Sequence, residues 1–269
     1  MNLQLDGKTA LVSASTAGIG LEIARELKRE GARVIINGRT EERVRSALEA
    51  LASFSGLQGN PHEGPAAVGL AADLSTEAGI ARLQAFAPEV DILVNNLGVF
   101  EARNLEEIGR EDWLRMFEVN TLSGARLTQV YLPGMKARGW GRVIFVASET
   151  AINIPSDMIH YGVSKAAQVA LARGLAETTA GTAVTVNSVL PGPTLSEGVT
   201  TFLNDVVGQR PDPEAAQAEF LAKLRPTSLL KRFARADEVS ALVAYLASPR
   251  ASATNGAALR VEGGLLRNA

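Results

Sequence analysis

Tyr161 and Lys165 stand four residues apart in a segment, residues 157–179, whose pattern predicts a helix with Asp157 as a cap or first-turn acid. At this spacing both side chains project from one helix face. A tyrosine has an unperturbed pKa of about 10 and is a poor acid or base at neutral pH. A neighbouring ammonium favours the phenolate and lowers that pKa, so Lys165 suits Tyr161 to proton transfer.

A serine precedes this pair at the end of an apolar run. Ser148 follows the predicted strand at residues 143–146, and ligands of open α/β sheets bind at the carboxyl ends of strands. Its hydroxyl could donate or accept a hydrogen bond at a substrate oxygen. A tyrosine and a lysine at this spacing are commonplace on helix surfaces, so the interpretation depends on the surrounding elements. His160 lies about 100° around the helix from Tyr161 and is expected to be structural or at the pocket edge.

A run of small residues joins the first predicted strand, residues 9–12, to a helix. Residues 13–20 read Ser-Ala-Ser-Thr-Ala-Gly-Ile-Gly, and an apolar stripe of helical period continues to Leu27. A strand, a small-residue turn and a helix N-terminus together present free backbone N–H groups to a pyrophosphate. A tight structural turn would also use two glycines, so the flanking elements carry the interpretation.

The second predicted strand ends where a nucleotide's adenosine ribose would lie. An NAD enzyme usually offers a carboxylate there, whereas this chain has Gly38 and then Arg39. The positive charge suits the 2′-phosphate of NADP. The alternative is an ordinary solvated arginine. We therefore expect NADP as the cofactor.

Short apolar runs alternate with longer segments of helical period, as in strand–helix–strand units that build a parallel sheet. Most runs are uniformly apolar, which indicates helices on both faces. No change of composition separates two parts, so the sequence predicts one doubly wound α/β domain. The strand candidates are residues 9–12, 33–36, 91–94, 143–146 and 184–186, with weaker ones at 67–70 and 257–261.

Composition limits the other classes of function. The formal net charge of the 269 residues is -2 without blocks of like charge, so no nucleic-acid partner is expected. The absence of cysteine excludes disulfides and thiolate chemistry. Only His62, in a turn-rich loop where we expect it to be solvated, and His160 are available, so no metal site is expected. Without a signal-peptide pattern or a run of about 18 apolar residues, we expect a cytoplasmic protein with no membrane partner.

These features together resemble the short-chain dehydrogenase/reductase family over essentially the whole chain. The family's turn, Thr-Gly, three residues and Gly-x-Gly, is matched by residues 13–20, and its later Pro-Gly motif by Pro191-Gly192. Its Asn-Asn-Ala-Gly segment appears as residues 95–98. Its catalytic positions fall on Asn120, Ser148, Tyr161 and Lys165.

The resemblance implies a Rossmann-type fold with a seven-stranded parallel sheet and hydride transfer between NADP(H) and an alcohol or ketone. Tyr161 would be the general acid or base, Lys165 would also hold the nicotinamide ribose, and Asn120 would hold a water in a proton relay. Asp73 would contact the adenine, and Pro191 to Thr194 would border the nicotinamide. The implied cofactor contacts are Ser13, Ser15, Thr16, Gly18, Ile19, Gly20, Arg39, Asp73, Leu74, Asn96, Tyr161, Lys165, Pro191, Gly192 and Thr194.

The same resemblance implies a single domain over residues 1–269, with a substrate lid at about 195–232. It also implies a homotetramer or homodimer built on the helices at 111–138 and 157–179. Two departures add bulk along the expected cofactor path: Ala14 replaces the first glycine of the turn, and Leu97 replaces a small alanine. If position 14 requires positive φ, an alanine there is strained.

Three functions remain open from these residues. The first is a ketoreductase or alcohol dehydrogenase, and the second is a sensor that binds NADP without turnover. The third is an enzyme that performs epimerisation or dehydration in the same site. The pocket is expected to be mainly apolar, and Glu149 either recognises a cationic or hydroxylated substrate or faces solvent. The pocket candidates are Glu149, Ile152, Asn153, Ile154, Leu195, Val199 and Phe202.

Overall fold

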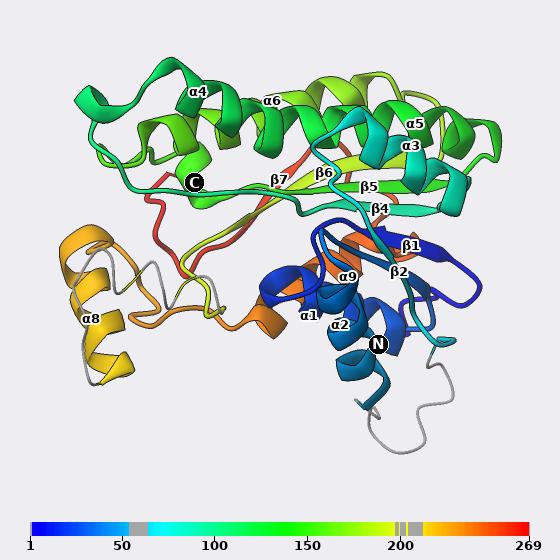
Figure 1. Cartoon of the computed structure of the whole chain (residues 1–269), viewed down its shortest axis with the longest axis horizontal. Coiled ribbons are helices and arrows are strands. Elements are labelled where there is room, and N and C mark those ends of the chain that lie inside the picture. The colour runs from blue at the N-terminus through cyan, green and yellow to red at the C-terminus, as the bar shows by residue number, and fades with distance from the viewer. Residues whose placement is uncertain (1, 54–63, 197–198, 200–202, 204–211, 269) are drawn as a thin grey trace.

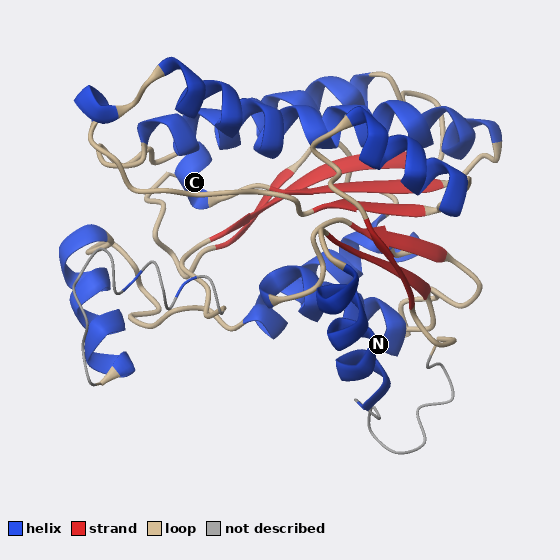
Figure 2. Ribbon diagram, in the orientation of Figure 1, coloured by secondary structure: helices blue, strands red, loops and turns tan. Residues whose placement is uncertain are grey.

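A computed structural model describes residues 2–53, 64–196, 199, 203 and 212–268, and both His62 and Phe202 lie outside these residues. Seven parallel strands form one sheet in the order β3-β2-β1-β4-β5-β6-β7 (Figure 2). All seven predicted strands are present, so the seven-stranded sheet of the Rossmann type is confirmed. The strands are β1 (Thr9–Val12), β2 (Arg33–Gly38), β3 (Val68–Ala71), β4 (Ile92–Asn95), β5 (Gly141–Val146), β6 (Val184–Pro191) and β7 (Ala258–Val261).

Helices cover both faces of the sheet (Figure 1). Alternate residues of a strand enter different cores: Ala10 and Val12 pack on the side of α1, α2 and α9, whereas Leu11 packs on the side of α3, α5 and α6. Because both faces are buried, the strands are apolar at nearly every position. The helices are α1 (Gly18–Arg29), α2 (Glu41–Ser53), α3 (Glu77–Phe86), α4 (Arg110–Phe117), α5 (Ser123–Ala137), α6 (Ile159–Glu177), α8 (Pro213–Leu224) and α9 (Ala236–Ala247).

Three short helical turns lie near the site or between helices. They are η1 (Leu105–Glu107), the π-helical turn η2 (Glu118–Leu122) and η3 (Glu149–Ala151); a fourth, η4 (Pro249–Ala251), follows α9. The segment from α4 through η2 to α5 matches the helix expected at 111–138. In the described part of the chain, no helix has the length and apolar character needed to cross a membrane.

The start of α6 differs from the expectation for Asp157. The helix begins at Ile159, its N-cap is Met158, and neither a side-chain cap nor a first-turn acid is present. Asp157 lies too early to reach the free N–H groups, and its carbonyl oxygen instead accepts a hydrogen bond from the N–H of Arg103, at 2.7 Å. The expected cap is therefore wrong.

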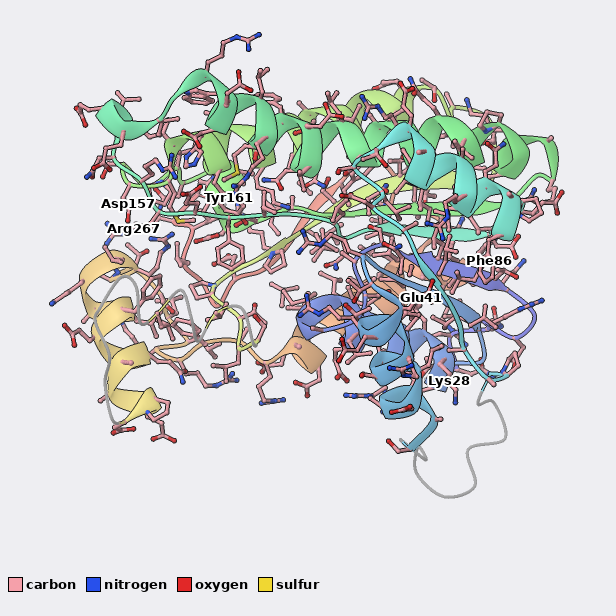
Figure 3. All side chains as sticks on the ribbon, in the orientation of Figure 1. Lys28, Glu41, Phe86, Asp157, Tyr161 and Arg267 are labelled. Carbon is pink, nitrogen blue, oxygen red and sulfur yellow. The ribbon has the colours of Figure 1, made fainter. Side chains whose placement is uncertain are left out.

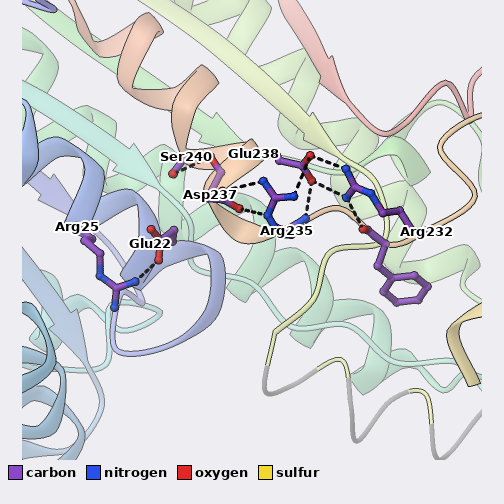
Figure 4. Close-up of polar contacts among 8 residues, drawn as sticks. Glu22, Arg25, Arg232, Arg235, Asp237, Glu238 and Ser240 are labelled. Carbon is purple, nitrogen blue, oxygen red and sulfur yellow. Dashed lines mark hydrogen bonds and ion pairs between the residues drawn. The ribbon is translucent and has the colours of Figure 1, made fainter. Parts of the chain in front are cut away.

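Ion pairs stabilise the segment that joins α8 to α9. Arg232 donates to both carboxylate oxygens of Glu238, at 2.7 and 2.8 Å, and Arg235 pairs with Asp237 at 2.9 Å (Figure 4). In Figure 1, α8 stands apart from both helix layers. It packs through Phe220 on Phe233, with ring centroids 5.4 Å apart. These contacts fix the position of α8 near the site described next.

Candidate functional site

Ser148, Tyr161 and Lys165 meet at the carboxyl end of β5. Ser148 follows the strand, and α6, which contacts η3, carries the other two side chains. Tyr161 is labelled in Figure 3. Lys165 is 4% exposed, and its Nζ donates to the carbonyl oxygen of Val146 at 2.9 Å and to Oε1 of Gln168 at 3.1 Å. The predicted cluster of three side chains is therefore present.

The fourth predicted residue, Asn120, joins the neighbouring strand to α6. It lies in the π-turn η2, a distortion that often marks functional sites. Its Oδ1 accepts from the N–H of Val99 at 2.7 Å, and its Nδ2 donates to the carbonyl of Val99 and to Oγ of Ser164, each at 2.9 Å. The side chain is fully buried, so in this geometry it positions the backbone of Val99 and the start of α6.

Burial dominates the electrostatics of the Tyr161–Lys165 pair. It raises the pKa of Tyr161 to about 12 and lowers that of Lys165 to about 7. The expected lowering of the tyrosine pKa by the ammonium is therefore wrong for this structure, because loss of solvent disfavours both charged forms. The Lys165 Nζ lies 5.9 Å from the centroid of the Tyr161 ring.

Glu149 does not face solvent, which was one of the two expectations made for it. It is 3% exposed, and its Oε2 accepts hydrogen bonds from Oγ of Ser148 at 2.7 Å and from the N–H of Thr150 at 2.8 Å. Its Oε1 accepts from Nε of Arg225, at 2.9 Å. The carboxylate lines the triad cavity, and recognition of a substrate by it stays a prediction. Sequence reasoning missed Arg225, whose only signal is its place within the irregular, proline-containing segment at 195–232.

The small-residue turn after β1 is held by its own serines. Ser13 Oγ accepts from the N–H groups of Asn96 and Leu97, at 2.9 and 3.0 Å, and Ser15 Oγ donates to the carbonyl of Val12 at 2.7 Å. Both serines are fully buried, and their N–H groups bond to neighbouring strand ends. They shape the turn through these hydrogen bonds, and their direct contact with a cofactor stays a prediction.

The remaining turn residues lead into the first turn of α1. Gly18 and Ala14 both take positive φ, 55° and 49°, so position 14 does require the backbone conformation that strains an alanine. Asn96 ties the turn by donating to the carbonyls of Ser13 and Ala14, at 3.1 and 3.0 Å. A Cβ on Gly20 would lie 2.4 Å from Nδ2 of Asn96, so this close approach requires glycine. The unpaired backbone N–H groups at the start of α1 therefore lie at this turn.

A cavity runs from this turn past the end of β2. Arg39 reaches it, as predicted, and so does Arg43 in the first turn of α2, which sequence reasoning missed although it follows Arg39 by one helical turn. Hydrogen bonds from Ser75 and the charge of Arg39 lower the pKa of Asp73. The lining residues are Ala14, Thr16, Ala17, Asn37, Gly38, Arg39, Arg43, Ala72, Asp73, Leu74, Ser75, Leu97, Gly98, Val99 and Val119.

A second cavity of about 220 Å³ contains the triad. It shares Gly98 and Val99 with the first, so the two adjoin at the end of β4. A Cβ on Gly98 would lie 3.3 Å from Nζ of Lys165. Most of the other residues that line this second cavity are apolar, as expected. The further lining residues are Ile19, Asn96, Phe100, Val146, Ala147, Glu149, Thr150, Met158, Pro191, Gly192, Pro193, Thr194, Ser196, Val199, Phe220, Arg225 and Phe233.

The segment after β6 closes one side of this cavity. A Cβ on Gly192 would come within 2.8 Å of Cα of Glu262, so the chain can pass β7 only with glycine there. Thr194 turns its hydroxyl back to the carbonyl of Gly192, at 2.9 Å. The predicted residues Pro191, Gly192 and Thr194 therefore lie beside the triad.

His160 points away from the cavity, as predicted. It is fully buried and meets the ring of Trp113 edge-on, with centroids 6.2 Å apart, and burial lowers its pKa. Over the ranges that the structure describes, no three acidic, histidine or cysteine side chains gather closely enough to hold a metal ion.

Comparison with known proteins assigns the family. Residues 13–266 match a family model described as Enoyl-(Acyl carrier protein) reductase. The chain belongs to the short-chain dehydrogenase/reductase family.

Other short-chain dehydrogenase/reductases match it from end to end. "Uncharacterized oxidoreductase YvaG" of Bacillus subtilis is 48% identical, over 100% of this chain and 99% of that protein. D-beta-hydroxybutyrate dehydrogenase of Cupriavidus necator is 33% identical, over 97% and 98%. The crystal structure of L-sorbose reductase from Gluconobacter frateurii, complexed with NADPH and L-sorbose, has a TM-score of 0.89 at 27% identity and full coverage of both chains. The family is thus one of oxidoreductases, and this structural neighbour binds an NADP-type cofactor.

Proposed function

We propose that the chain transfers a hydride between NADP(H) and an alcohol or ketone, with Ser148, Tyr161 and Lys165 at the reacting oxygen. The observation that carries this proposal is that the three side chains line one cavity, which adjoins a second cavity reached by two arginines. An elongated dinucleotide needs such a continuous path between its nicotinamide and adenosine ends.

The residues of the first cavity fit an NADP-type cofactor. The start of α1 offers backbone N–H groups and the positive end of a 12-residue helix to a pyrophosphate. Arg39 and Arg43 supply two positive charges at the ribose end, where a 2′-phosphate would lie. Gly38 has no room for a carboxylate, because even a Cβ would lie 2.4 Å from Cγ2 of Thr16. These features support NADP over NAD.

The chemistry assigned to the second cavity is proton transfer at a substrate oxygen. When bound, NADPH would supply the hydride. Tyr161 keeps its proton at neutral pH because burial raises its pKa to about 12, and it can give that proton to the alkoxide left by reduction. Ser148 is placed to hold the same oxygen. With its pKa lowered to about 7, Lys165 can change charge near neutral pH.

The proposal extends to the whole chain. Residues 1–269 would act as a single domain whose segment at about 195–232 is the substrate lid, since Ser196, Val199, Phe220 and Arg225 line the triad cavity. We further propose a homotetramer or homodimer built on the layer of α4, α5 and α6. Leu114 and Leu122 support this, because they expose 46% and 41% of their surface there. Light scattering on the purified protein tests the oligomeric state.

The decisive experiment separates an enzyme from a sensor. Purified protein is mixed with NADPH and carbonyl compounds related to the substrates of its relatives, acetoacetate, L-sorbose and 5-ketogluconate, while the absorbance of the reduced nicotinamide is followed. The reverse reaction uses NADP with D-beta-hydroxybutyrate, D-sorbitol and gluconate. Turnover of any compound, lost in Tyr161→Phe, supports the enzyme; NADPH binding without turnover across a broader panel would favour the sensor.

A further inference from the structure

The buried Glu149–Arg225 ion pair ties the serine of the triad to a helix 76 residues away in sequence. The two side chains are 4% and 7% exposed, and Arg225 directly follows α8. Its Nη1 also donates to the carbonyl of Leu224, at 2.9 Å, which fixes the guanidinium to the end of that helix. Taking two charges out of water is costly, and a buried pair offsets that cost only through close geometry and further hydrogen bonds such as these.

The group that depends on it is the hydroxyl of Ser148. A serine has a single O–H, and here it is donated to Oε2 of Glu149 at 2.7 Å. The lone pairs of Oγ are thereby left to accept, as they do from the N–H of Thr150 at 3.2 Å. To donate to a substrate oxygen, the hydroxyl must turn away from the carboxylate. The strength of the carboxylate as an acceptor therefore decides how readily Ser148 turns.

Arg225 controls that strength. A lone carboxylate in a low-dielectric site is a strong acceptor that binds protons tightly. A charge-assisted hydrogen bond from a guanidinium offsets its charge and weakens its hold on other donors. Because Arg225 belongs to the end of α8, this compensation exists only while the helix is packed against the triad cavity.

We propose that Glu149 and Arg225 are positioning residues for Ser148: Glu149 sets the orientation of the serine hydroxyl, and Arg225 couples the strength of that hold to the docking of α8. This inference rests on the proposed function, since it concerns the same reacting oxygen. Neither side chain takes part in the proton transfer itself.

The two charges also act on Tyr161 with opposite signs. After burial, which is the largest cause of its raised pKa, the Glu149 carboxylate raises the pKa further and the Arg225 guanidinium lowers it. Among the described residues, the other charged group beside the ring is Lys165, from α6. Removing one member of the pair should therefore shift the tyrosine titration in one direction, and removing the other should shift it in the opposite direction.

A double-mutant cycle tests the proposal, with Glu149→Gln, Arg225→Met and the double variant. The substrate is the panel alcohol that the wild-type protein oxidises fastest, because oxidation requires the phenolate and its rate rises with pH. We expect the rising part of kcat against pH, and with it the midpoint, to move to lower pH in Glu149→Gln and to higher pH in Arg225→Met. The double variant should return near the wild-type midpoint. In each single variant kcat should fall about tenfold or more, with the Kd for NADPH unchanged.

The control is Lys223→Met, which removes an exposed ion pair with Glu219 from the same helix. It should leave kcat and the pH profile unchanged. Shifts of the same sign or absent shifts would overturn the proposal, because the two charges then would not act on the site in opposite directions. Should Arg225→Met fail to fold, Glu149→Gln decides alone: any outcome but a lower midpoint contradicts the proposal.

A readout without turnover separates this proposal from the proposed function. The phenolate absorbance of Tyr161 is obtained in the NADP-saturated protein as the difference between each variant and its Tyr161→Phe counterpart. If no panel compound reacts, the proposed function fails, and the titration is compared with the same variants in a Ser148→Ala background. Opposite shifts that shrink without the serine hydroxyl support the positioning pair, and shifts that Ser148→Ala leaves unchanged contradict it. Identical titrations in the two single variants would reject it.

Discussion

Nζ of Lys165 donates a hydrogen bond to the carbonyl oxygen of Val146, 2.9 Å away, so the buried ammonium of α6 is fixed to the end of β5. This contact connects the helix that carries Tyr161 to the strand that leads to Ser148. Burial of the Lys165 ammonium at this junction disfavours its charged form and lowers its pKa to about 7. The packing of α6 on the end of β5 thus both positions the two side chains and buries the ammonium.

Tyr161→Phe should abolish turnover and leave NADPH binding nearly intact. The substitution removes only the phenol oxygen, while the ring can keep its edge-on contact with Phe100, whose centroid lies 6.3 Å away. General acid–base catalysis contributes about 10²- to 10⁴-fold, so kcat should fall by that order. Steady-state kinetics and NADPH fluorescence titration measure both quantities. Activity within about tenfold of wild type would contradict the role of the phenol.

The burial of Lys165 should make stability depend on pH. Its folded pKa, about 7, lies below the ordinary lysine value of 10.5, so between these values the unfolded chain binds more protons. Stability therefore rises as pH increases through this window, and the cost of burying the ammonium is fully present below about pH 7. We expect Lys165→Met to gain most stability relative to wild type at about pH 6, by a few kcal/mol, and least near pH 10. Urea unfolding at several pH values measures this difference; a constant difference would mean that Lys165 keeps its charge.

Much of the fold was predictable because parallel strands buried on both faces are apolar throughout, as in residues 143–146. The site was predictable where chemistry depends on neighbours in sequence, such as Tyr161 and Lys165. The role of Arg225 could not be predicted, because its partner Glu149 is distant in the chain and the packing of α8 brings the two together. The expected lowering of the Tyr161 pKa was wrong for a related reason. Burial depends on the tertiary structure, and its effect on the pKa outweighs that of the adjacent charge.

Arg39→Asp should weaken NADPH binding much more than NADH binding, since only NADPH carries the 2′-phosphate. Arg43→Ala should have a smaller effect in the same direction, because it removes one of the two charges at the cavity without adding a negative one. We expect a loss of about tenfold per charge-assisted contact. Arg45, exposed on α2 and absent from the cavity lining, provides the control: Arg45→Ala should bind both cofactors as wild type does. Equal losses for NADPH and NADH in the Arg39 variant would refute the preference for NADP.

Ala14→Gly should tighten NADPH binding and raise stability. Ala14 has φ of 49° in the turn between β1 and α1, where an L-residue is strained by about 1 kcal/mol and glycine is not. Part of this gain is lost to the greater freedom of glycine in the unfolded chain, so we expect a net increase of at most about 1 kcal/mol. Gln4, with φ of 57° at an exposed site distant from both cavities, is the matched control. Gln4→Gly should raise stability by a similar amount without changing the Kd for NADPH. Tighter binding in Ala14→Gly alone would show that strain in the turn limits how the cofactor is seated, whereas unchanged binding would contradict this prediction.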